Sequence, residues 1–494
     1  MTRTYQTTLC ARAVKLTLGG ALLSSVLAVP SVAEASFLSQ AYKDATTGDK
    51  VTLAFVNYYK SAHRYDSNKL AGTDGHHTQF EWTQSAGIFY KTGNIKFGNS
   101  PIKMNLNIGY SHVFELDHQY PGDMHNWQAG QKLLQSTDCF WTGGEPFKGQ
   151  YKCNDVQGFG KIPVANAMFV WKGGNMVVGD GFFNAGMITT ANQDDATLSS
   201  YRGVMVKHKW QDYLFDGAFV TGFMEGLGDE MGDLTTASNY YDPYPNSYDY
   251  LYTARVTRNV NRKWGYMVSY GEAQDYLRRF HTNIWMNHAV SPETNLFLKA
   301  QYYFNKAAGD LWQEDVERGV AAFDDHASLI AYEGKVTHDA WDLWYGYHTV
   351  DAPSAEKSGG FSYGFGSAKG YLSLATSPGY SSFRRDGGET HVVGISYDLR
   401  HLGMPDVNLA YRYHWDNAPV PHHTTNEIET GRAEEHVLDL MYRPRSGSLK
   451  GFEFSLRSSM YRPDRIYAKL DDTKEGDRAD INAIKAIMAY SFQL

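Results

Sequence analysis

Residues that could carry out catalysis are few and poorly assembled in this sequence. Residues 360–364 (Gly-Phe-Ser-Tyr-Gly) have the spacing of a nucleophile elbow, which requires a strand before the serine and a helix after it. No helical pattern follows here, so a flexible loop is the better interpretation. Residues 324–326 (Asp-Asp-His) pair acids with a histidine, but they stand at a loop-to-strand junction without an obvious partner. We therefore expect no enzymatic activity.

Candidate metal ligands are equally isolated. His76 and His77 are neighbours, as are His422 and His423, and adjacent side chains point apart in an extended chain. The acidic stretch 471–480 lacks the spacing of a calcium-binding loop. We expect no metal and no other cofactor.

Six charged residues are more informative, because each stands beside apolar or aromatic residues in an alternating stretch. They are Arg255, Lys299, Glu333, Arg412, Glu453 and Arg457. Alternation with a period of two is typical of a β-strand, whose successive side chains point to opposite faces. The six charges are therefore expected to share the polar faces of strands.

Alternating stretches recur from residue 103 to residue 494 and must position these charges. Short turns separate some of them, as at 172–175 and 259–263, and long polar segments separate the others. The long segments are 60–77, 114–160, 225–247, 305–325, 351–388, 415–434 and 462–478. This order predicts an all-β, antiparallel, up-and-down sheet of about 16 to 18 strands, with long loops at one end and short turns at the other.

The first 35 residues differ from the rest of the chain. Arg3, Arg12 and Lys15 precede an apolar stretch over 16–29, and the small residues Ala33 and Ala35 then suit a cleavage site. We expect 1–35 to be a signal peptide and 36–494 to be the mature domain. The formal net charge of −8 becomes about −10 after cleavage, so no nucleic-acid partner is expected.

Export also bears on the cysteines that remain after cleavage. Cys139 and Cys153 lie fourteen positions apart within the long segment 114–160. Disulfides form in exported proteins, and two cysteines without an adjoining histidine make a poor zinc site. We expect one local disulfide, and two free thiols are the alternative.

Alternating strands suit either a soluble barrel with an apolar core or a membrane barrel with an apolar outer face. Export, the large strand number and aromatics near expected strand ends, such as Tyr59, Trp264, Trp341, Tyr347 and Tyr413, favour the membrane. The last residues printed also alternate, as the closing strand of such a barrel does. We therefore predict a transmembrane β-barrel with long extracellular loops and short periplasmic turns, in the outer membrane of a Gram-negative bacterium.

In a membrane barrel the six charged residues are expected to line the lumen, since a charge facing the bilayer midplane costs about 2–4 kcal/mol. Two interpretations remain open. The cations could form a basic track that guides anionic or polar solutes, or the charges could form salt bridges that only brace the wall.

Short motifs spread over the mature chain point to one family. They are Val51 to Tyr59, Glu81-Trp82-Thr83-Gln84, Ser200-Tyr201-Arg202-Gly203, Gly388-Glu389, Tyr397-Asp398-Leu399, Gly403-Met404-Pro405-Asp406, Tyr411, Tyr413, and Trp415-Asp416-Asn417-Ala418. In these motifs the chain resembles the OprD family of outer-membrane porins, and the late stretch is most similar to the chitoporin branch. The long insertion at 114–160 departs from the family pattern, so the loop that narrows the pore is not identified.

The resemblance implies a barrel of 18 strands, monomeric or trimeric, that passes amino acids, carboxylates or chitooligosaccharides. We predict passive, semi-selective diffusion of small polar solutes, with sugars slightly favoured because the sequence is rich in aromatics. The alternatives are a barrel enzyme, either protease or lipase, and a structural or adhesive barrel. Expected partners are the solutes, outer-membrane lipid and lipopolysaccharide, and the barrel-assembly machinery through the C-terminal strand.

Overall fold

The computed structural model describes most of the chain from residue 48 onward. The described residues are 48–65, 76–119, 125–126, 133–141, 151–190, 195–236, 245–260, 262–355, 359–370, 373–381, 383–421, 428–468 and 480–493. The predicted signal peptide 1–35, the pair His422 and His423, and the acidic stretch 471–479 lie outside them. No helix among these residues is long and apolar enough to cross a membrane.

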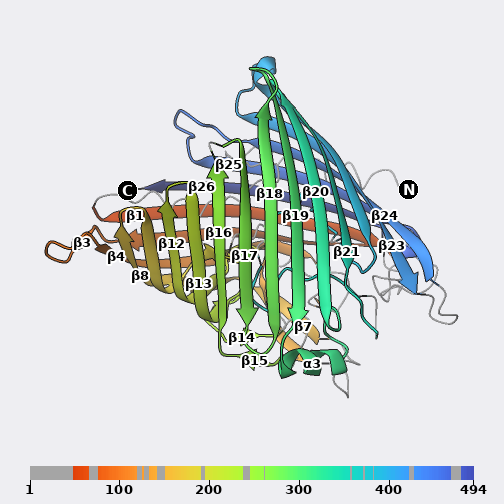
Figure 1. Ribbon diagram of the computed structural model, residues 1–494, viewed down its shortest axis with the longest axis horizontal. Helices are drawn as coiled ribbons and strands as arrows, with labels where there is room; N and C mark the ends of the chain where they lie inside the picture. The colour runs from red at the N-terminus through yellow and green to blue at the C-terminus, as the bar shows by residue number, and fades with distance from the viewer. Residues whose placement is uncertain are drawn as a thin grey trace.

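Eighteen long strands of the described residues form one closed antiparallel barrel (Figure 1). They are β1 (Lys50–Tyr65), β2 (His76–Lys91), β4 (Lys103–Gln119), β8 (Phe159–Trp171), β9 (Gly174–Gly181), β12 (Ser200–Trp210), β13 (Tyr213–Met224), β16 (Leu251–Val260), β17 (Trp264–Ala273), β18 (Leu277–Ala289), β19 (Thr294–Ala307), β20 (His326–His338), β21 (Trp341–Asp351), β22 (Glu389–Asp398), β23 (Val407–Pro421), β24 (Ile428–Tyr442), β25 (Phe452–Pro463) and β26 (Ile481–Gln493). The two-residue strand β3 (Ile95–Lys96) extends the edge of β4.

Each long strand pairs with the next one along the chain, and β26 pairs with β1 from Thr52↔Gln493 to Arg64↔Ile481. This last pairing closes the sheet, so every long strand has a neighbour on both sides, as a spanning sheet requires. Turns such as Lys172–Gly173 and Gln211–Asp212 join strands at one end of the barrel, here called the short-turn end. The opposite end, called the long-loop end, carries most of the longer connections.

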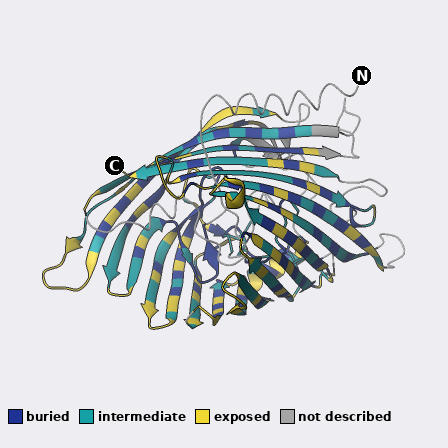
Figure 2. Ribbon diagram, turned by 90° about the horizontal axis from the view of Figure 1, so that it is seen from above, coloured by how far each residue is buried: buried dark blue, intermediate teal, exposed yellow. Residues whose placement is uncertain are grey.

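Burial follows the predicted alternation. On β17, Trp264, Val268 and Tyr270 are exposed, whereas Met267 and Ser269 are buried. Figure 2 shows the same banding along most strands, with yellow exposed positions between blue buried ones. The exposed set is largely apolar and the buried set is rich in polar side chains, as a barrel in lipid requires.

Smaller elements lie in the connections between the long strands. They are β5 (His125–Asn126), β6 (Gln135–Trp141), β7 (Tyr151–Gln157), β10 (Asn184–Ala185), β11 (Ile188–Thr189), β14 (Leu234–Thr235), β15 (Ser247–Tyr248), α3 (Asp310–Glu317) and the 3-10 turn η1 (Leu399–Leu402). The sequence predicted only polar loops over 114–160, 225–247 and 305–325, so these pieces were missed. Each is short and is held by contacts with other segments, which local periodicity does not reveal.

Several predicted boundaries were wrong. Much of 415–434 is strand, because β23 runs to Pro421 and β24 begins at Ile428, and β1 continues to Tyr65 through residues predicted as loop. Tyr59, Tyr347 and Tyr413 therefore lie inside strands rather than near strand ends. These strands extend further than a membrane requires, and their outer parts are polar enough to resemble loops.

Candidate functional site

The interior of the barrel is the candidate site, and two segments from the long-loop end fold into it. The first inward segment, 182–199, follows β9 and is described over 182–190 and 195–199. Asp216 Oδ1 accepts the backbone N–H of Gly186 at 2.5 Å, and Thr253 Oγ1 accepts that of Met187 at 2.8 Å. Both acceptors lie on the buried faces of their strands, so this segment packs against the lumen side of β13 and β16.

The glycine at position 186 allows the first inward segment to lie this close to the barrel wall. Its φ is +56°, in the left-handed region, and a Cβ at this position would overlap the side chain of Thr253. A larger residue would push the first inward segment away from the wall.

The second inward segment, 359–381, is described over 359–370 and 373–381 and crosses the interior of the barrel. Arg279 of β18 donates to the carbonyl oxygen of Tyr363, and Gln301 Nε2 of β19 donates to that of Ser373 at 2.6 Å. Further along, Ser377 accepts a hydrogen bond from β23. The segment therefore contacts the lumen face over a wide arc of strands.

Two buried wall carboxylates hold inward backbone. Glu435 Oε1 of β24 accepts the N–H groups of Gly379 at 2.9 Å and Tyr380 at 2.7 Å, and Oε2 accepts that of Ser381 at 3.0 Å. Glu81 Oε2 of β2 accepts the N–H groups of residues 133 and 134 at 2.6 and 2.9 Å. Hydrogen bonds to an ionised acceptor are about twice as strong as neutral ones.

The two inward segments also bind each other. Ile188 pairs with Gly370 in an antiparallel bridge, and the N–H of Thr189 donates to the carbonyl oxygen of Lys369 at 3.1 Å. The Lys369 ammonium forms an ion pair with Asp195. The segments therefore form one connected structure inside the barrel.

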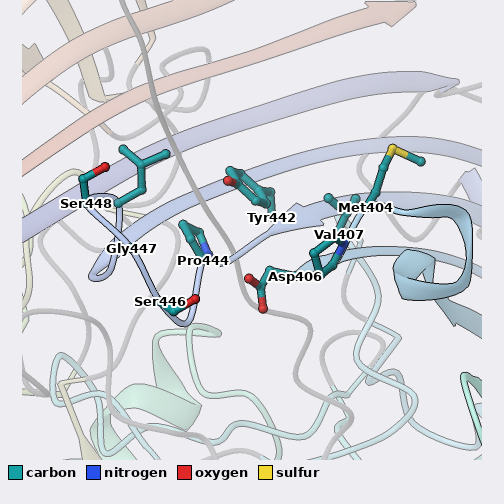
Figure 3. A pocket seen from close by; sticks show the side chains of 10 residues that line it. Met404, Asp406, Val407, Tyr442, Pro444, Ser446, Gly447 and Ser448 are labelled. Atoms are coloured by element: carbon teal, nitrogen blue, oxygen red, sulfur yellow. The ribbon is translucent and has the colours of Figure 1, made fainter.

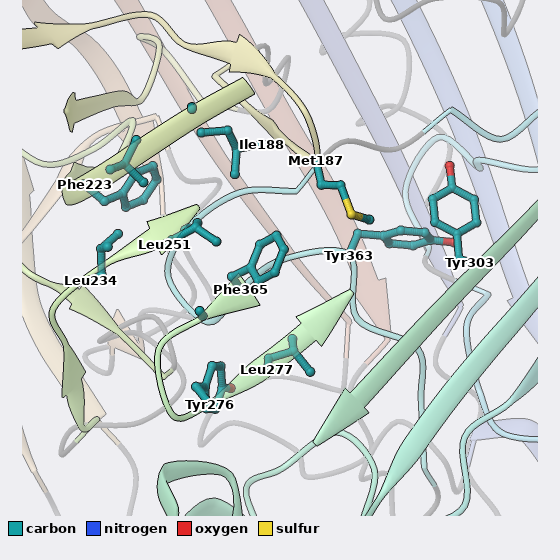
Figure 4. Close-up of a cluster of buried hydrophobic side chains, with 14 of the residues drawn as sticks. Met187, Ile188, Phe223, Leu234, Leu251, Tyr276, Leu277, Tyr303, Tyr363 and Phe365 are labelled. Atoms are coloured by element: carbon teal, nitrogen blue, oxygen red, sulfur yellow. The ribbon is translucent and has the colours of Figure 1, made fainter. Parts of the chain in front are cut away.

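A cluster of buried apolar side chains stabilises this structure (Figure 4). It combines residues of the first inward segment, the second inward segment and the wall. Those labelled in the figure are Met187, Ile188, Phe223, Leu234, Leu251, Tyr276, Leu277, Tyr303, Tyr363 and Phe365. Several lumen aromatics are thus covered by packing.

Arg255 and Lys299, which are among the six predicted pore-lining residues, contribute to the anchoring of the inward segments. Arg255 Nε donates to Asp216 Oδ2 at 3.0 Å, while the other oxygen of that carboxylate holds the first inward segment. Lys299 Nζ lies 3.7 Å from Glu333 Oε2, and it donates to the carbonyl and hydroxyl oxygens of Ser373, both at 2.9 Å. Both cations therefore act in part as braces.

Arg412 and Arg457 share one carboxylate. Arg412 Nη2 donates to Asp439 Oδ2 at 2.7 Å, and Arg457 Nε donates to Asp439 Oδ1 at 2.6 Å. Arg412 also donates to the carbonyl oxygen of Ser377 at 3.2 Å. The side chain of Arg457 is 24% exposed against 14% for Arg412, so Arg457 is the more accessible of the two.

Glu453 lies near the short-turn end, where its carboxylate accepts a hydrogen bond from Arg443 Nη2 at 2.6 Å. All six predicted residues follow the parity of the buried faces along their strands. Pore lining by these residues stays a prediction.

A row of charges crosses neighbouring strands on the same face. Lys60 of β1 lies opposite Lys485 of β26, and Lys485 lies opposite Arg457 of β25. Glu81 ends the row beside Lys60, and Asp439 follows Arg457 on β24. We call Glu81, Lys60, Lys485, Arg457 and Asp439, with the adjoining Arg412, the charged row.

The sequence missed Lys60, Lys485 and Asp439. Lys60 was placed in a loop because the end of β1 was set too early. Lys485 and Asp439 each interrupt apolar stretches by one residue, as Arg412 and Arg457 do, so the same parity argument could have found them.

A buried hydrogen-bond network ties the second inward segment to β21–β23. His348 Nδ1 lies 2.6 Å from Thr376 Oγ1, and Nε2 lies 2.7 Å from the carbonyl oxygen of Phe383. Since a carbonyl only accepts, Nε2 carries the proton. Thr390 Oγ1 lies 3.0 Å from the same nitrogen and donates to Asp416 Oδ1 at 2.6 Å.

The motifs that resembled catalytic groups serve other roles here. Residues 360–364 belong to the second inward segment, where the carbonyl oxygen of Ser362 accepts a hydrogen bond from Asn305 at 2.8 Å. Hydrogen bonds from Lys306 and His326 lower the pKa of Asp325. No group of three or more potential ligand side chains is arranged for a metal ion within the described part of the chain.

The cysteines lie in the hairpin of β6 and β7. The register places Cys139 directly opposite Cys153, although their side chains lie outside the described parts of these strands. Facing positions are the arrangement that a bond between two strands requires. The disulfide itself stays a prediction.

A shallow pocket of about 400 Å³ lies apart from the interior, between two turns at the short-turn end (Figure 3). Its lining residues are Met404, Pro405, Asp406, Val407, Tyr442, Pro444, Ser446, Gly447, Ser448 and Leu449. It shares no residue with the inward segments or the charged row.

Comparison with known proteins agrees with this architecture. The sequence model of a family described as "outer membrane porin, OprD family" matches residues 170–494. A search of curated proteins by sequence found no match.

Solved structures with the same fold include three porins. Acinetobacter baumannii OccAB3 is 14% identical, with a TM-score of 0.67, over 90% of this chain and 99% of that one. Pseudomonas aeruginosa OccK9 (OpdG) is 14% identical, with a TM-score of 0.69, over 90% and 98%. Pseudomonas aeruginosa OpdK, solved with vanillate, is 14% identical, with a TM-score of 0.66, over 91% and 100%.

Proposed function

Because the chain belongs to the OprD family of outer membrane porins, which are channels for small solutes in the Gram-negative outer membrane, we propose that it favours small anionic solutes such as carboxylates. The long-loop end is then extracellular and the short-turn end periplasmic.

The charged row is the observation that carries the proposal. It combines four cations, Lys60, Lys485, Arg457 and Arg412, with two carboxylates, Glu81 and Asp439. Glu81 is engaged by backbone N–H groups, and Asp439 is shared by two arginines. An excess of positive charge along a low-dielectric wall raises the local concentration of anions.

The inward segments supply the second part of the proposal. We propose that segments 182–199 and 359–381 together narrow the pore, which leaves a passage beside the charged row. Their mutual bridge and their anchoring by Asp216, Glu435 and Lys299 support a fixed constriction rather than loosely attached loops.

The sugar preference suggested by the sequence has less support. Sugar rings stack on open aromatic faces, but Tyr303 and Tyr363 are buried in the cluster inside the barrel. The OpdK structure was solved with vanillate, which is a carboxylate. Chitooligosaccharides therefore remain the competing outcome.

The test is liposome swelling with the purified mature protein, beside single-channel recording in a planar bilayer. Solutes of matched size should include a monocarboxylate, a neutral sugar, a basic amino acid and a chitooligosaccharide. We expect the carboxylate to enter fastest. Faster entry of neutral or N-acetylated sugars would refute anion preference, and absence of conductance would refute channel function altogether.

A further inference from the structure

A row of polar side chains crosses the outer wall at its extracellular border. On β16–β20 the outward positions Tyr252, Glu272, Arg278, Lys306 and His326 are successive register partners. Each side chain points to the same side of its strand as the exposed apolar residues nearer the short-turn end. The row therefore faces the membrane side of the barrel.

Its height places it at the boundary between lipid tails and headgroups. Glu272 lies eight residues beyond Trp264, which begins β17 at the periplasmic end. At about 3.3 Å per residue and a strand tilt of about 40°, this corresponds to roughly 20 Å along the membrane normal. The apolar band of such barrels is about 25 Å tall, so the row lies near its outer border.

Two cations occupy adjacent places in this row, which we call the outer cation pair. Arg278 and Lys306 are direct cross-strand partners, and their side chains are 55% and 44% exposed. Like charges directly opposite each other destabilise a sheet. Glu272 and Asp325 each offset one of these charges, and an anion bound between the two cations would contact both.

The neighbouring groups leave the guanidinium available. Glu272 Oε1 lies 3.2 Å from Arg278 Nε, while Oε2 accepts hydrogen bonds from the hydroxyls of Tyr252 at 2.9 Å and Tyr270 at 2.6 Å. The terminal nitrogens of Arg278 have no hydrogen-bond partner among the described residues. Glu272 therefore fixes the side chain through Nε and leaves the two-pronged end for a ligand.

Lys306 completes the arrangement. Its ammonium forms an ion pair with Asp325, which uses one of its three donors. Below the pair, toward the membrane centre, the outer wall presents Tyr270, Tyr302 and Ile330, all exposed. The pair therefore combines donors for an anion with an apolar surface for attached acyl chains.

We propose that the outer cation pair binds a phosphate group of the glycolipid in the outer leaflet. Arg278 provides a forked donor that matches phosphate oxygens, and Lys306 provides a point charge beside it. The apolar wall below contacts the lipid's acyl chains. This inference rests on the proposed orientation, in which the long-loop end is extracellular, and does not depend on which solute passes.

The test uses the purified full chain, delipidated in detergent, and measures lipid binding by native mass spectrometry. The added ligand is diphosphorylated lipid A, and the same lipid without phosphates is the chemical control. We expect Arg278→Gln with Lys306→Gln to weaken binding of diphosphorylated lipid A at least about tenfold, in line with the loss of charge-assisted hydrogen bonds. Each single substitution should produce part of this loss.

Arg202→Gln is the matched control. Arg202 is also exposed on the outer wall, but Asp180 accepts hydrogen bonds from both its Nε, at 2.8 Å, and its Nη2, at 3.0 Å. Binding should be unchanged in this variant. Equal loss in Arg202→Gln, unchanged binding in the double variant, equal binding of the dephosphorylated lipid, or full competition by inorganic phosphate at equal concentration would each overturn the proposal.

Discussion

Substitutions at Arg457 and Asp439 should shift ion selectivity in opposite directions. Arg457 and Asp439 form one salt bridge, with 2.6 Å between Nε and Oδ1. If the charged row guides ions, Arg457→Gln removes a positive charge and favours cations, whereas Asp439→Asn removes a negative charge and favours anions. If the pair only braces the wall, both variants break the same contact, and ion selectivity should not shift in opposite directions in the two variants.

The expected size follows from Coulomb's law. A unit charge about 5 Å from a passing ion in water contributes about 0.8 kcal/mol, and screening at 0.1 M salt reduces this to about 0.5 kcal/mol. That energy changes the local concentration of each ion about twofold, in opposite senses for anions and cations. The permeability ratio should therefore change about fourfold in each variant.

The assay is the reversal potential across a salt gradient in a planar bilayer. Asp439 is buried, and breaking a buried pair costs about 3–5 kcal/mol, so a heat-modifiability gel must first show that each variant folds. Arg202→Gln and Asp180→Asn break a comparable salt bridge on the outer wall and should leave the potential unchanged. Shifts of the same sign in Arg457→Gln and Asp439→Asn, or no shift in folded protein, would refute the guiding role.

Three further predictions concern the inward segments and the hairpin of β6 and β7. Glu435→Gln weakens the hydrogen bonds to the backbone at 379–381, so the open-channel current noise should rise. Glu434→Gln, on the opposite face of β24, should leave the noise unchanged. Equal noise in both variants would contradict the anchoring role. Gly186→Val should displace the first inward segment and raise single-channel conductance in protein that still folds, and unchanged conductance would exclude this segment from the constriction. The unfolded, unreduced mature protein should titrate with no free thiol at Cys139 and Cys153, and the disulfide should add about 3 kcal/mol of stability; two free thiols would disprove it.

The barrel could be predicted from the sequence because its main rule is local. Each strand must present apolar side chains to lipid at every second position, and this pattern can be read within ten residues. The same parity argument assigned faces to Arg412 and Arg457 that agree with burial along β23 and β25. Strand ends were harder to predict, because outward positions beyond the membrane need not be apolar and the alternation fades, as in β23 beyond Trp415.

The interior could not be predicted in the same way. The anchors join residues far apart in sequence, such as Glu81 with Leu133, Glu435 with Gly379, and Asp195 with Lys369. Nothing in the local pattern at 182–199 distinguishes a segment that folds inward from one that projects outward. A glycine at 186 and a carboxylate at 216 acquire their roles only when the strands bring them together.

This difference explains why the two interpretations of the lumen charges remained open in the sequence. Parity fixes the face of a charged residue but gives no information on its partner across the sheet. With partners known, Lys299 and Arg255 brace the inward segments, while Arg457 lies in a row with Lys60 and Lys485. A side chain that braces the wall and a side chain that guides ions lie on the same face of the strand. The two roles are therefore distinguished only by removing, in separate variants, the positive and the negative charge of one salt bridge.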